Sequence, residues 1–562
     1  MMKKRSFLIV LLLAVYLFTA CGSKQETGNS QQAQSSENSQ GSQNSQNLQN
    51  SQNPQDSQDP QDTQNSQGTS NNQGSENNQT SQKPVDGKCH VDADANDLCD
   101  ICGKTVLVYV DFYSINDLHG KIADGTSHPG VDELTTYLKN AKKSDDYMFV
   151  LSAGDMWQGS AESNMTKGML TTEWMNELDF VGMTLGNHEF DWGEEYIRNN
   201  HAIAEFPFLA INIYDRATNK PVDYCQPSVM VEAGDLQIGI IGAIGDCYSS
   251  ISADKVGDVY FKVQKELTEL VKAESEKLRK EGADCIVYVI HDGYGQSKSN
   301  NAISSSQIKS YYDVTLSNGY VDLVFEGHTH QKYILQDEYG VYHMQHGGDN
   351  YGGISHAELA INSVNNKIRV NQARLVTTGS YESLEDDQIV NNLLEKYKEQ
   401  IEPANKVLGY NRTYRSGDYM RQIVADLYYE AGMKKWGEQY DIALGGGFIS
   451  VRSPYKLQAG DVTYSMLQSL FPFDNELVLC SIKGRDLKTR FFENDHEDYF
   501  IKYGDYGNSI RNQIDPNATY YIVTDTYSSL YKPNKLTEVE RYDAGIFARD
   551  LLAEYIKNGR LN

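Results

Sequence analysis

Leu185-Gly186-Asn187-His188-Glu189-Phe190-Asp191 is the stretch of sequence that decides the fold. It follows a short apolar run and contains an amide at Asn187, an imidazole at His188 and a carboxylate at Asp191. This mixture suits a multiply charged site better than a packed core, although a polar turn after a strand is an equal alternative for the stretch alone. Further stretches of the same kind elsewhere in the chain favour the site.

Four other stretches also place Asp or His directly after an apolar run. They are Asn116-Asp117-Leu118-His119-Gly120, Ala153-Gly154-Asp155, His291-Asp292-Gly293 and Gly327-His328-Thr329-His330. In α/β folds the loops that follow the carboxyl ends of strands build the site. Because independent coincidence in five loops is improbable, the sequence predicts a metal site where these loops meet.

The chemistry of these side chains narrows the choice of metal. Imidazole and carboxylate without thiolate suit Zn²⁺, Mn²⁺ or Fe better than Ca²⁺. The groups are too numerous for one tetrahedral ion, whereas a set with one bridging carboxylate would serve two ions about 3.5–4 Å apart. The sequence therefore predicts two divalent metal ions, each of them Zn, Mn or Fe.

From Thr105 onward, short apolar runs alternate with amphipathic helical segments. Strands are predicted at 106–110, 148–151, 180–185, 237–244, 285–290 and 321–325, and helices at 132–142, 172–178 and 262–281. This alternation predicts a layered α/β domain over residues 105–380. A polar helical segment at 381–403 is expected to link it to a second, α+β domain over residues 404–562.

The beginning of the chain is typical of an exported protein. Residues 1–21 combine a basic start with an apolar run, Phe7 to Phe18, that is too short for a membrane span. The end of this segment resembles the bacterial lipoprotein signal, which implies lipidation of Cys21 at the outer face of the bacterial cell membrane; an ordinary secretory signal is the alternative. Residues 22–87 are rich in Ser, Gln and Asn and should form a disordered tether of about 45 Å average span.

A small motif at residues 88–104 joins the tether to the first domain. Cys99 and Cys102 have the spacing of a zinc knuckle, and Cys89 and His90 complete a possible structural metal site. Alternatives are a disulfide-bonded or merely polar linker. The alternation of Asp92, Asp94 and Asn96 also looks like the start of a calcium loop, but the later Glu and turn Gly are missing.

The net charge of the 562-residue chain is −27. Such a charge argues against binding to nucleic acid polymers, since this requires Lys and Arg to neutralise phosphate. It does not exclude small anionic substrates, because a bound metal reverses the local field. No protein partner is evident from the sequence, and contact with a membrane is expected only through the lipid on Cys21.

From Val106 to the C-terminus the chain resembles the calcineurin-like metallophosphoesterases, and specifically the two-domain 5′-nucleotidase family. The resemblance rests on the five loops and implies a four-layer metallophosphoesterase β-sandwich flanked by helices, followed by a smaller α+β substrate-binding domain. It implies two ligand sets that share a bridging Asp155, and a catalytic pair formed by His188 and Asp191. The sets are Asp117, His119, Asp155 and His330 for one metal, and Asp155, Asn187, His291 and His328 for the other.

The resemblance also implies residues that bind the nucleotide. Phe473 and Tyr527 would stack on the base and Asn475 would reach its edge, although both rings could instead be core aromatics. Candidates for phosphate binding are Arg415, Arg421 and Arg452. The family pattern Asn-Gly-Gly-Gly-Ile-Arg is altered here, with Leu444 in place of Asn and the Arg two residues late, so the preferred nucleotide stays open.

These features together predict a surface-anchored dimetal phosphohydrolase that cleaves phosphate esters of extracellular nucleotides with a metal-activated water. A 2′,3′-cyclic-nucleotide phosphodiesterase or a UDP-sugar hydrolase on the same site is the enzymatic alternative. A nucleotide-binding surface protein without catalysis is the alternative outside enzymes.

Overall fold

The computed structural model describes residues 91–124, 129–294, 320–337, 339–346, 353–449, 456–493, 499–504, 510–530, 536–543 and 545–562. The expected signal and tether, with Cys21, Cys89 and His90, lie outside these residues, as does Arg452. Among the helices of this described part, none is both long and apolar enough to cross a membrane.

The first sheet has six strands in the order β14 (Ile368–Val376), β13 (Gly353–Asn362), β1 (Leu107–Asn116), β2 (Met148–Ser152), β3 (Phe180–Thr184) and β4 (Phe208–Leu209). Strands β1 to β4 run parallel to one another, and β13 pairs with β1 in the antiparallel sense. The carboxyl ends of β1, β2 and β3 therefore lie at one edge of this sheet.

The second sheet also has six strands, in the order β11 (Lys332–Gln336), β12 (Tyr342–His346), β10 (Leu323–Glu326), β9 (Cys285–His291), β7 (Leu236–Ile244) and β6 (Ser228–Ala233). Strands β7, β9, β10 and β12 are parallel, whereas β6 and β11 are antiparallel edge strands. All seven residues of β9 are buried, as expected for a parallel strand covered on both faces.

The two sheets pack face to face through a shared apolar core. Phe112 of β1 contacts Phe325 of β10, with their ring centroids 6.5 Å apart. Leu359 of β13 and Val287 of β9 belong to the same buried cluster. Strands that are far apart in sequence are thereby brought to the same end of one sandwich.

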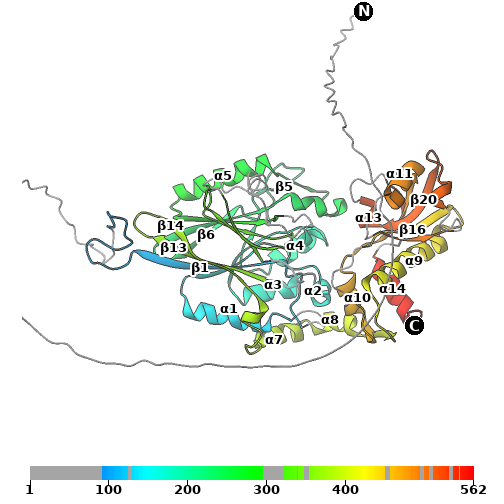
Figure 1. Cartoon of the computed structure of the whole chain (residues 1–562), viewed down its shortest axis with the longest axis horizontal. Helices are drawn as coiled ribbons and strands as arrows, with labels where there is room; N and C mark the ends of the chain where they lie inside the picture. The colour runs from blue at the N-terminus through cyan, green and yellow to red at the C-terminus, as the bar shows by residue number, and fades with distance from the viewer. Residues whose placement is uncertain are drawn as a thin grey trace, which may run out of the picture. The chain divides into compact units, whose positions relative to one another are not determined.

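Helices cover the outer faces of the sandwich, with α5 (Lys265–Lys280) on one side and α1 (Asp132–Ser144) on the other (Figure 1). Leu267, Val271 and Leu278 of α5 pack on the second sheet. The first sheet is covered by α1, α3 (Met169–Asn176), α4 (Glu194–His201) and α7 (Gln388–Lys396), and α2 (Ala161–Thr166) packs against α3. These α, β, β and α layers confirm the predicted four-layer architecture.

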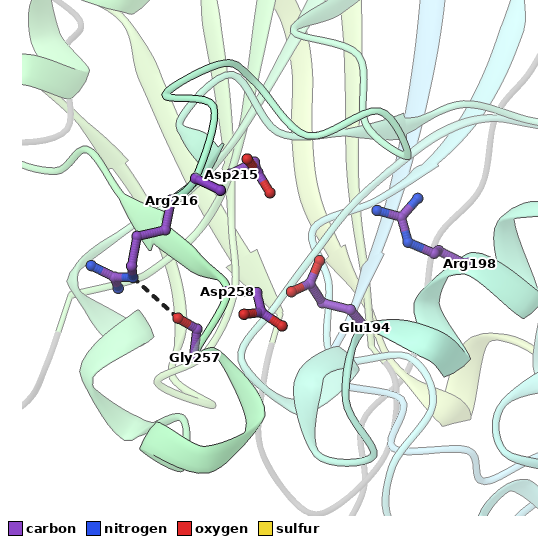
Figure 2. A pocket seen from close by; sticks show the side chains of 7 residues that line it. Glu194, Arg198, Asp215, Arg216, Gly257 and Asp258 are labelled. Atoms are coloured by element: carbon purple, nitrogen blue, oxygen red, sulfur yellow. Dashed lines mark hydrogen bonds between the residues drawn. The ribbon is translucent and has the colours of Figure 1, made fainter.

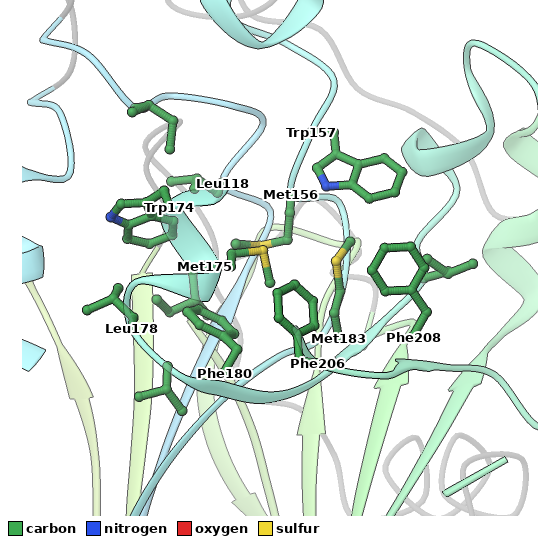
Figure 3. Packing of buried hydrophobic residues seen from close by; sticks show 14 of the residues in the cluster. Leu118, Met156, Trp157, Trp174, Met175, Leu178, Phe180, Met183, Phe206 and Phe208 are labelled. Carbon is green, nitrogen blue, oxygen red and sulfur yellow. The ribbon is translucent and has the colours of Figure 1, made fainter. Parts of the chain in front are cut away.

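The core under these helices is rich in aromatic and sulfur-containing side chains. Figure 3 shows Trp174 and Met175 of α3 packed with Phe180 and Met183 of β3. The ring centroids of Trp174 and Phe180 are 6.0 Å apart. The indole nitrogen of Trp174 donates a hydrogen bond to Thr135 Oγ1 at 2.8 Å, which satisfies the polar end of a buried ring.

The polar segment predicted as a linker forms two consecutive helices, α7 and α8 (Lys398–Asn405). Asp387 caps α7 by accepting a hydrogen bond from the Ile389 amide at 2.9 Å. Val390, Leu393 and Ile401 join the core below the first sheet, so the exposed faces carry the polar residues that give the segment its composition.

The C-terminal region has its own five-stranded sheet, in the order β19 (Tyr499–Tyr503), β16 (Ile442–Phe448), β20 (Thr519–Asp525), β18 (Leu477–Lys483) and β21 (Thr537–Arg541). One apolar cluster contains residues of α9 (Gly417–Trp436), α10 (Tyr464–Leu470) and α14 (Ala548–Lys557), and another contains residues of α11 (Gly484–Lys488) and α12 (Ile510–Gln513). A two-stranded ladder of β15 (Val407–Asn411) and β17 (Gly460–Thr463) completes this α+β unit. In the first region, β5 (Ile213–Asp215) pairs with β8 (Val259–Phe261).

Candidate metal centre

The five loops singled out in the sequence come together at one end of the sandwich. Three follow β1, β2 and β3 of the first sheet, and two follow β9 and β10 of the second. Asp117 Oδ1 lies 3.3 Å from His330 Nε2, and His119 Nε2 lies 3.2 Å from the same nitrogen. Asp117, His119 and His330 therefore form one compact group.

Asp155 lies between this group and a second one. Its Oδ2 is 3.1 Å from His291 Nε2, and potential ligand atoms of Asp155, Asp117 and His291 lie within 4.8 Å of one another. Asp155 forms a similar group with His119 and His188. A carboxylate in this position can contact two neighbouring ions, which is the geometry that a bridging ligand requires.

Asn187 and His328 complete the residues that the sequence assigned to the second ion. The Asn187 side chain is buried and its Oδ1 has no hydrogen-bond partner among the described residues. The rings of His328 and His291 lie 5.5 Å apart between centroids. A buried oxygen without a partner fits a cation, because such an atom otherwise pays the full cost of desolvation.

Backbone carbonyls orient two of the imidazoles. His119 Nδ1 lies 2.8 Å from the Gln158 carbonyl oxygen, and His291 Nδ1 lies 2.6 Å from the Ala153 carbonyl oxygen. A carbonyl can only accept, so each Nδ1 carries a proton, and Nε2 is the nitrogen that can bind a metal when the ring is neutral. This arrangement is common for histidines that bind metals through Nε2.

The backbone at the site adopts conformations that side chains other than glycine rarely occupy. Five of the candidate ligands have positive φ angles, namely Asp117 (54°), His119 (53°), Asp155 (56°), His328 (71°) and His330 (53°). Each such residue costs on the order of 1–3 kcal/mol and persists only where surrounding contacts impose it. A Cβ atom at Gly186 would lie 2.3 Å from Asp155 Oδ1, so the loop after β3 needs glycine at this position to approach Asp155 closely.

The pKa shifts at the site show that its buried carboxylates attract positive charge. Burial opposes the charged form of His291, but Asp155 and Asp117 outweigh burial and raise the pKa of His291 to about 10. Burial and the neighbouring His291 lower the pKa of His328 to about 4. Burial opposes ionisation of Asp155, yet His291 and His188 hold its pKa well below the usual value. These charges and the donor set fit a pair of divalent cations.

Glu189 holds two of the ligand loops together, a role that its sequence motif does not reveal. Its buried carboxylate accepts hydrogen bonds from the amides of Asp155 (2.9 Å), Met156 (2.8 Å) and Gly186 (2.7 Å). Burial and the Asp155 charge raise the pKa of Glu189 to about 7. The loops after β2 and β3 are thereby fixed to one side chain.

Gln345 of β12 has a corresponding role for the loop after β10. Its Oε1 accepts hydrogen bonds from Thr329 Oγ1 and from the Gln331 amide, both at 3.0 Å. Its Nε2 donates to the Gly327 carbonyl at 2.9 Å and to the Tyr333 hydroxyl at 3.0 Å. His328 and His330 therefore sit on a loop anchored at both ends by one buried amide.

The predicted catalytic pair lies beside the metal centre. His188 Nδ1 is 2.8 Å from Asp191 Oδ2, and the His188 amide donates to Asp155 Oδ1 at 2.8 Å. Asp191 thus fixes the orientation of the imidazole, while the backbone of His188 is tied to the proposed bridging carboxylate. Both residues line a cavity of about 410 Å³ that also reaches Asn187 and His328.

The cavity extends into the C-terminal region, where three predicted substrate residues line it. Phe473, Asn475 and Tyr527 are half-buried, and all three contribute to the wall. The Arg549 guanidinium, itself buried, donates to the Phe473 carbonyl at 2.8 Å and pairs with Asp474. Phe473 therefore belongs to a well-held turn at the rim of the cavity rather than to the core.

Of the three predicted phosphate-binding arginines, Arg452 lies outside the described residues, and Arg415 and Arg421 do not line this cavity. Arg415 donates to the Leu561 carbonyl at 2.9 Å, and Arg421 pairs with Asp418 at 3.0 Å. The cationic side chains in the wall are instead those of Lys167, Lys255 and Arg541, which no motif in the sequence identifies.

A second cavity of about 520 Å³ contains none of the candidate ligands in its described lining. Figure 2 shows the carboxylates of Glu194, Asp215 and Asp258 in this cavity, with Arg216 on one side and Arg198 on the other. Arg216 donates to the Gly257 carbonyl at 3.1 Å. Despite its larger volume, this cavity lacks the imidazoles that metal chemistry would need.

The small motif before the first domain is only partly described. Asp92, Asp94 and Asp100 offer carboxylate oxygens within 4.8 Å of one another. Asp92 is buried and accepts hydrogen bonds from the Asn96 amide at 3.0 Å and from Asn362 Nδ2 at 2.6 Å. Cys99 is buried and Cys102 is exposed, while their predicted partners Cys89 and His90 lie outside the described residues.

In a comparison with known proteins, residues 111–332 fit the calcineurin-like phosphoesterase family. This range runs from within β1 to beyond β10 and includes all seven candidate ligands. A solved structure with a similar fold is the 5′-nucleotidase precursor from Thermus thermophilus, with a TM-score of 0.60, 18% identity, and coverage of 80% of this chain and 96% of that one.

Curated relatives have low but significant identity. The endonuclease YhcR of Bacillus subtilis (strain 168) is 26% identical over 421 residues, which are 67% of this chain and 32% of that protein. A 5′-nucleotidase of Vibrio cholerae is 24% identical over 379 residues, 60% of this chain and 66% of the relative. A 2′,3′-cyclic-nucleotide 2′-phosphodiesterase/3′-nucleotidase of Salmonella typhimurium is 24% identical over 438 residues, 66% of each chain.

Proposed function

Because residues 111–332 match the calcineurin-like phosphoesterase family and the fold is similar to that of a 5′-nucleotidase precursor, we propose that the protein hydrolyses phosphate esters of nucleotides with two divalent metal ions. The observation that carries this proposal is the grouping of seven Asp, Asn and His side chains, Asp155 among them, beside a cavity that is also lined by His188 and Phe473. The name of the Vibrio relative supports a nucleotide as the substrate.

In the proposed site, Asp117, His119, Asp155 and His330 would hold one ion, and Asp155, Asn187, His291 and His328 would hold the other. When bound, two such ions orient a phosphoryl group and lower the pKa of water so that it becomes a nucleophile at neutral pH. The carbonyls of Gln158 and Ala153 keep the Nε2 lone pairs of His119 and His291 directed at the site. Because these two imidazoles are already oriented, no free energy is spent on reorienting them during catalysis.

His188 would act on the phosphoryl group or on the leaving oxygen. Its Nδ1 proton is shared with Asp191, which leaves Nε2 directed away from that carboxylate. An imidazole held in this way donates a hydrogen bond when protonated, and Asp191 stabilises the positive charge that develops. Phe473 and Tyr527 would hold the base by stacking, and Asn475 would contact its edge.

The proposed activity is tested by measuring phosphate release from AMP with purified protein, with and without a chelator. We expect release that stops on chelation and returns when Mn²⁺ or Zn²⁺ is added. Absence of turnover with a full complement of bound metal would favour the alternative of a nucleotide-binding surface protein. The complete ligand set together with His188 and Asp191 argues for catalysis, since binding alone does not require the pair.

A second candidate substrate class is the cyclic nucleotides, which the Salmonella relative favours by name. A panel of mononucleotides, 2′,3′-cyclic nucleotides and UDP-glucose, compared by kcat/KM, distinguishes these possibilities. We expect the highest value for 5′-mononucleotides. A higher value for 2′,3′-cyclic AMP would assign the chain to the alternative reaction.

We further propose that the protein is exported and attached to the outer face of the cell membrane through a lipid on Cys21. The support is the basic start, the short apolar run and the position of this cysteine in the sequence. Metabolic labelling with a radioactive fatty acid tests it: label should enter the wild-type protein and be absent from Cys21→Ala. Equal labelling of both proteins would contradict the proposal.

A further inference from the structure

A buried thiol lies next to the second group of candidate ligands. Cys247 belongs to the 3₁₀ turn Asp246–Ser250 that follows β7. Potential ligand atoms of Cys247, His291 and His328 all lie within 4.8 Å of one another. Among the groups of potential ligands in the described part of the chain, this is the one that contains a thiol.

The turn that carries Cys247 is fixed to the end of β9. The Gly245 amide donates to the His291 carbonyl at 3.0 Å, and the Asp246 amide donates to Asp292 Oδ2 at 2.8 Å. Cys247 Sγ itself is 2.8 Å from the His291 carbonyl oxygen. A Cβ atom at Gly245 would lie 2.2 Å from Asp292 Oδ2, so the contact with β9 requires glycine there. The thiol is thus held at the site by backbone contacts.

Polar atoms without hydrogen-bond partners adjoin this thiol. His291 is fully buried, and its Nε2 has no hydrogen-bond partner in the described part of the chain, although the Asp155 carboxylate lies 3.1 Å away. Cys247 is 4% exposed, which excludes a role as a surface thiol. A cation that accepts soft as well as hard ligands would account for a buried nitrogen without a hydrogen-bond partner that lies beside a carboxylate and belongs to the same group of potential ligands as a thiol.

We propose that Cys247 Sγ is a further ligand of the second metal position, where it binds a thiophilic divalent cation together with His291 and His328. Binding exchanges the S–H bond for a metal–sulfur bond of about 2.3 Å for Zn²⁺, and the proton leaves to solvent. The hydrogen bond from the thiol to the His291 carbonyl is lost in the same step. This inference rests on the proposed two-metal function and adds a selectivity for Zn²⁺, Co²⁺ or Cd²⁺ over Mn²⁺.

Absorption spectra of the full-length protein loaded with Co²⁺ test the inference. Wild type, Cys247→Ser and Cys285→Ser are compared at equal, measured cobalt content. Cys285 is a matched control, because it is a buried thiol at the opposite end of β9 from His291. Any cobalt bound near Cys99 and Cys102 contributes equally to all three spectra, so the difference spectra isolate Cys247.

We expect a near-ultraviolet thiolate-to-cobalt charge-transfer band in wild type and Cys285→Ser that decreases in Cys247→Ser, while the visible d–d bands remain. Identical spectra for wild type and Cys247→Ser, at two cobalt ions per chain, overturn the inference and leave the proposed function intact. Failure of all three proteins to bind cobalt contradicts the proposed function itself.

Metal affinity gives an independent readout. In Cys247→Ser we expect Cd²⁺ affinity to fall by about tenfold or more, with Mn²⁺ affinity changed less than about twofold, since only the soft ion depends on sulfur. Equal losses for both ions show that Cys247 has only a structural role and overturn the inference. Cobalt-edge X-ray absorption of a Cys99→Ser/Cys102→Ser variant, which keeps Cys247, must still show a sulfur neighbour, and this keeps the test decisive if Cys247→Ser does not fold.

Discussion

The imidazole of His188 stacks on the phenyl ring of Phe473, with 5.6 Å between ring centroids and 28° between ring planes. His188 follows β3 beside the metal centre, and Phe473 precedes β18 of the C-terminal region. One face of the phenyl ring therefore covers the proposed catalytic group. Lys167 and Asp474, 3.3 Å apart between Nζ and Oδ2, reinforce the same contact.

Replacing Phe473 by Ala should separate recognition of the base from catalysis on the phosphate. Stacking contributes about 1–3 kcal/mol per base, so we expect KM for AMP to rise about 5- to 150-fold. KM for ribose 5-phosphate, which has no base, should change much less. Steady-state kinetics with both substrates provide the measurement. An equal rise in KM for AMP and for ribose 5-phosphate would mean that Phe473 acts through His188 and not through the base.

Replacing His188 by Asn should slow the chemical step while the metal ions remain bound. A positioned acid or base contributes on the order of 10²–10⁴-fold, and we expect kcat to fall by that amount. Single-turnover kinetics together with metal analysis by mass spectrometry check this prediction. An unchanged kcat would remove His188 from the mechanism, and a loss of metal would make it a ligand.

Replacing Asp155 by Asn should remove binding at both metal positions, because this carboxylate belongs to both groups. We expect less than one ion per chain and no measurable phosphate release. Asp258→Asn, in the separate cavity of Figure 2, is the matched control and should keep both ions. Two ions retained in Asp155→Asn would be incompatible with a bridging role.

Replacing Gln345 by Leu should loosen the loop that carries His328 and His330. Four hydrogen bonds from one buried amide would be lost, and such supporting contacts typically change metal affinity by about 10–100-fold. Isothermal titration with Mn²⁺ provides the measurement. Gln336→Leu is a suitable control, since Gln336 is exposed on β11 and contacts only a turn carbonyl among its described hydrogen bonds. Equal affinities in the two variants would argue against this supporting role.

Asp132 at the start of α1 should make stability depend on pH. Burial and the nearby carboxylates of Asp124 and Asp386 raise the pKa of Asp132 from its ordinary value to about 7. The folded state then holds a proton that the unfolded state has lost, so stability present below about pH 4 falls as pH rises towards 7. The melting temperature of Asp132→Asn should match that of wild type at pH 4 and exceed it at pH 8.

Asp387 provides a control of opposite sign for that experiment. Burial opposes its ionisation, but Lys139, at 2.8 Å, lowers its pKa below the ordinary value. The ionised form therefore stabilises the folded protein above about pH 4, and Asp387→Asn should lower the melting temperature at pH 8. A pH-independent difference for Asp132→Asn would show that its carboxyl is not the source of the effect.

The sequence reveals the continuously apolar strands and the loops that follow them, but not β13, which is almost wholly buried. Runs such as Cys285 to Ile290 are continuously apolar, so their identity as strands does not depend on the partner. Strand β14 has an alternating, largely exposed pattern, Ile368-Arg369-Val370-Asn371, and is absent from the predicted strands. Its pairing with β13, and the division of the strands between two sheets, depend on contacts between residues distant in sequence.

The candidate site is also predictable only in part, because the sequence shows local chemical patterns but not contacts between separate segments. Ligands such as Asp117 and His328 have a chemical signature that is visible locally. Gln345 and Arg549 have none, because each acts through hydrogen bonds to a separate loop of the chain. Lys167 and Arg541 reach the cavity only through the approach of two regions of the chain.

The left-handed backbone at five of the candidate ligands couples the stability of the loops to the presence of cations. Each position carries local strain that glycine would relieve, but glycine has no side chain to offer to a cation. Cation binding should therefore stabilise the folded state, and the metal-free protein should melt at a lower temperature than the metal-loaded protein.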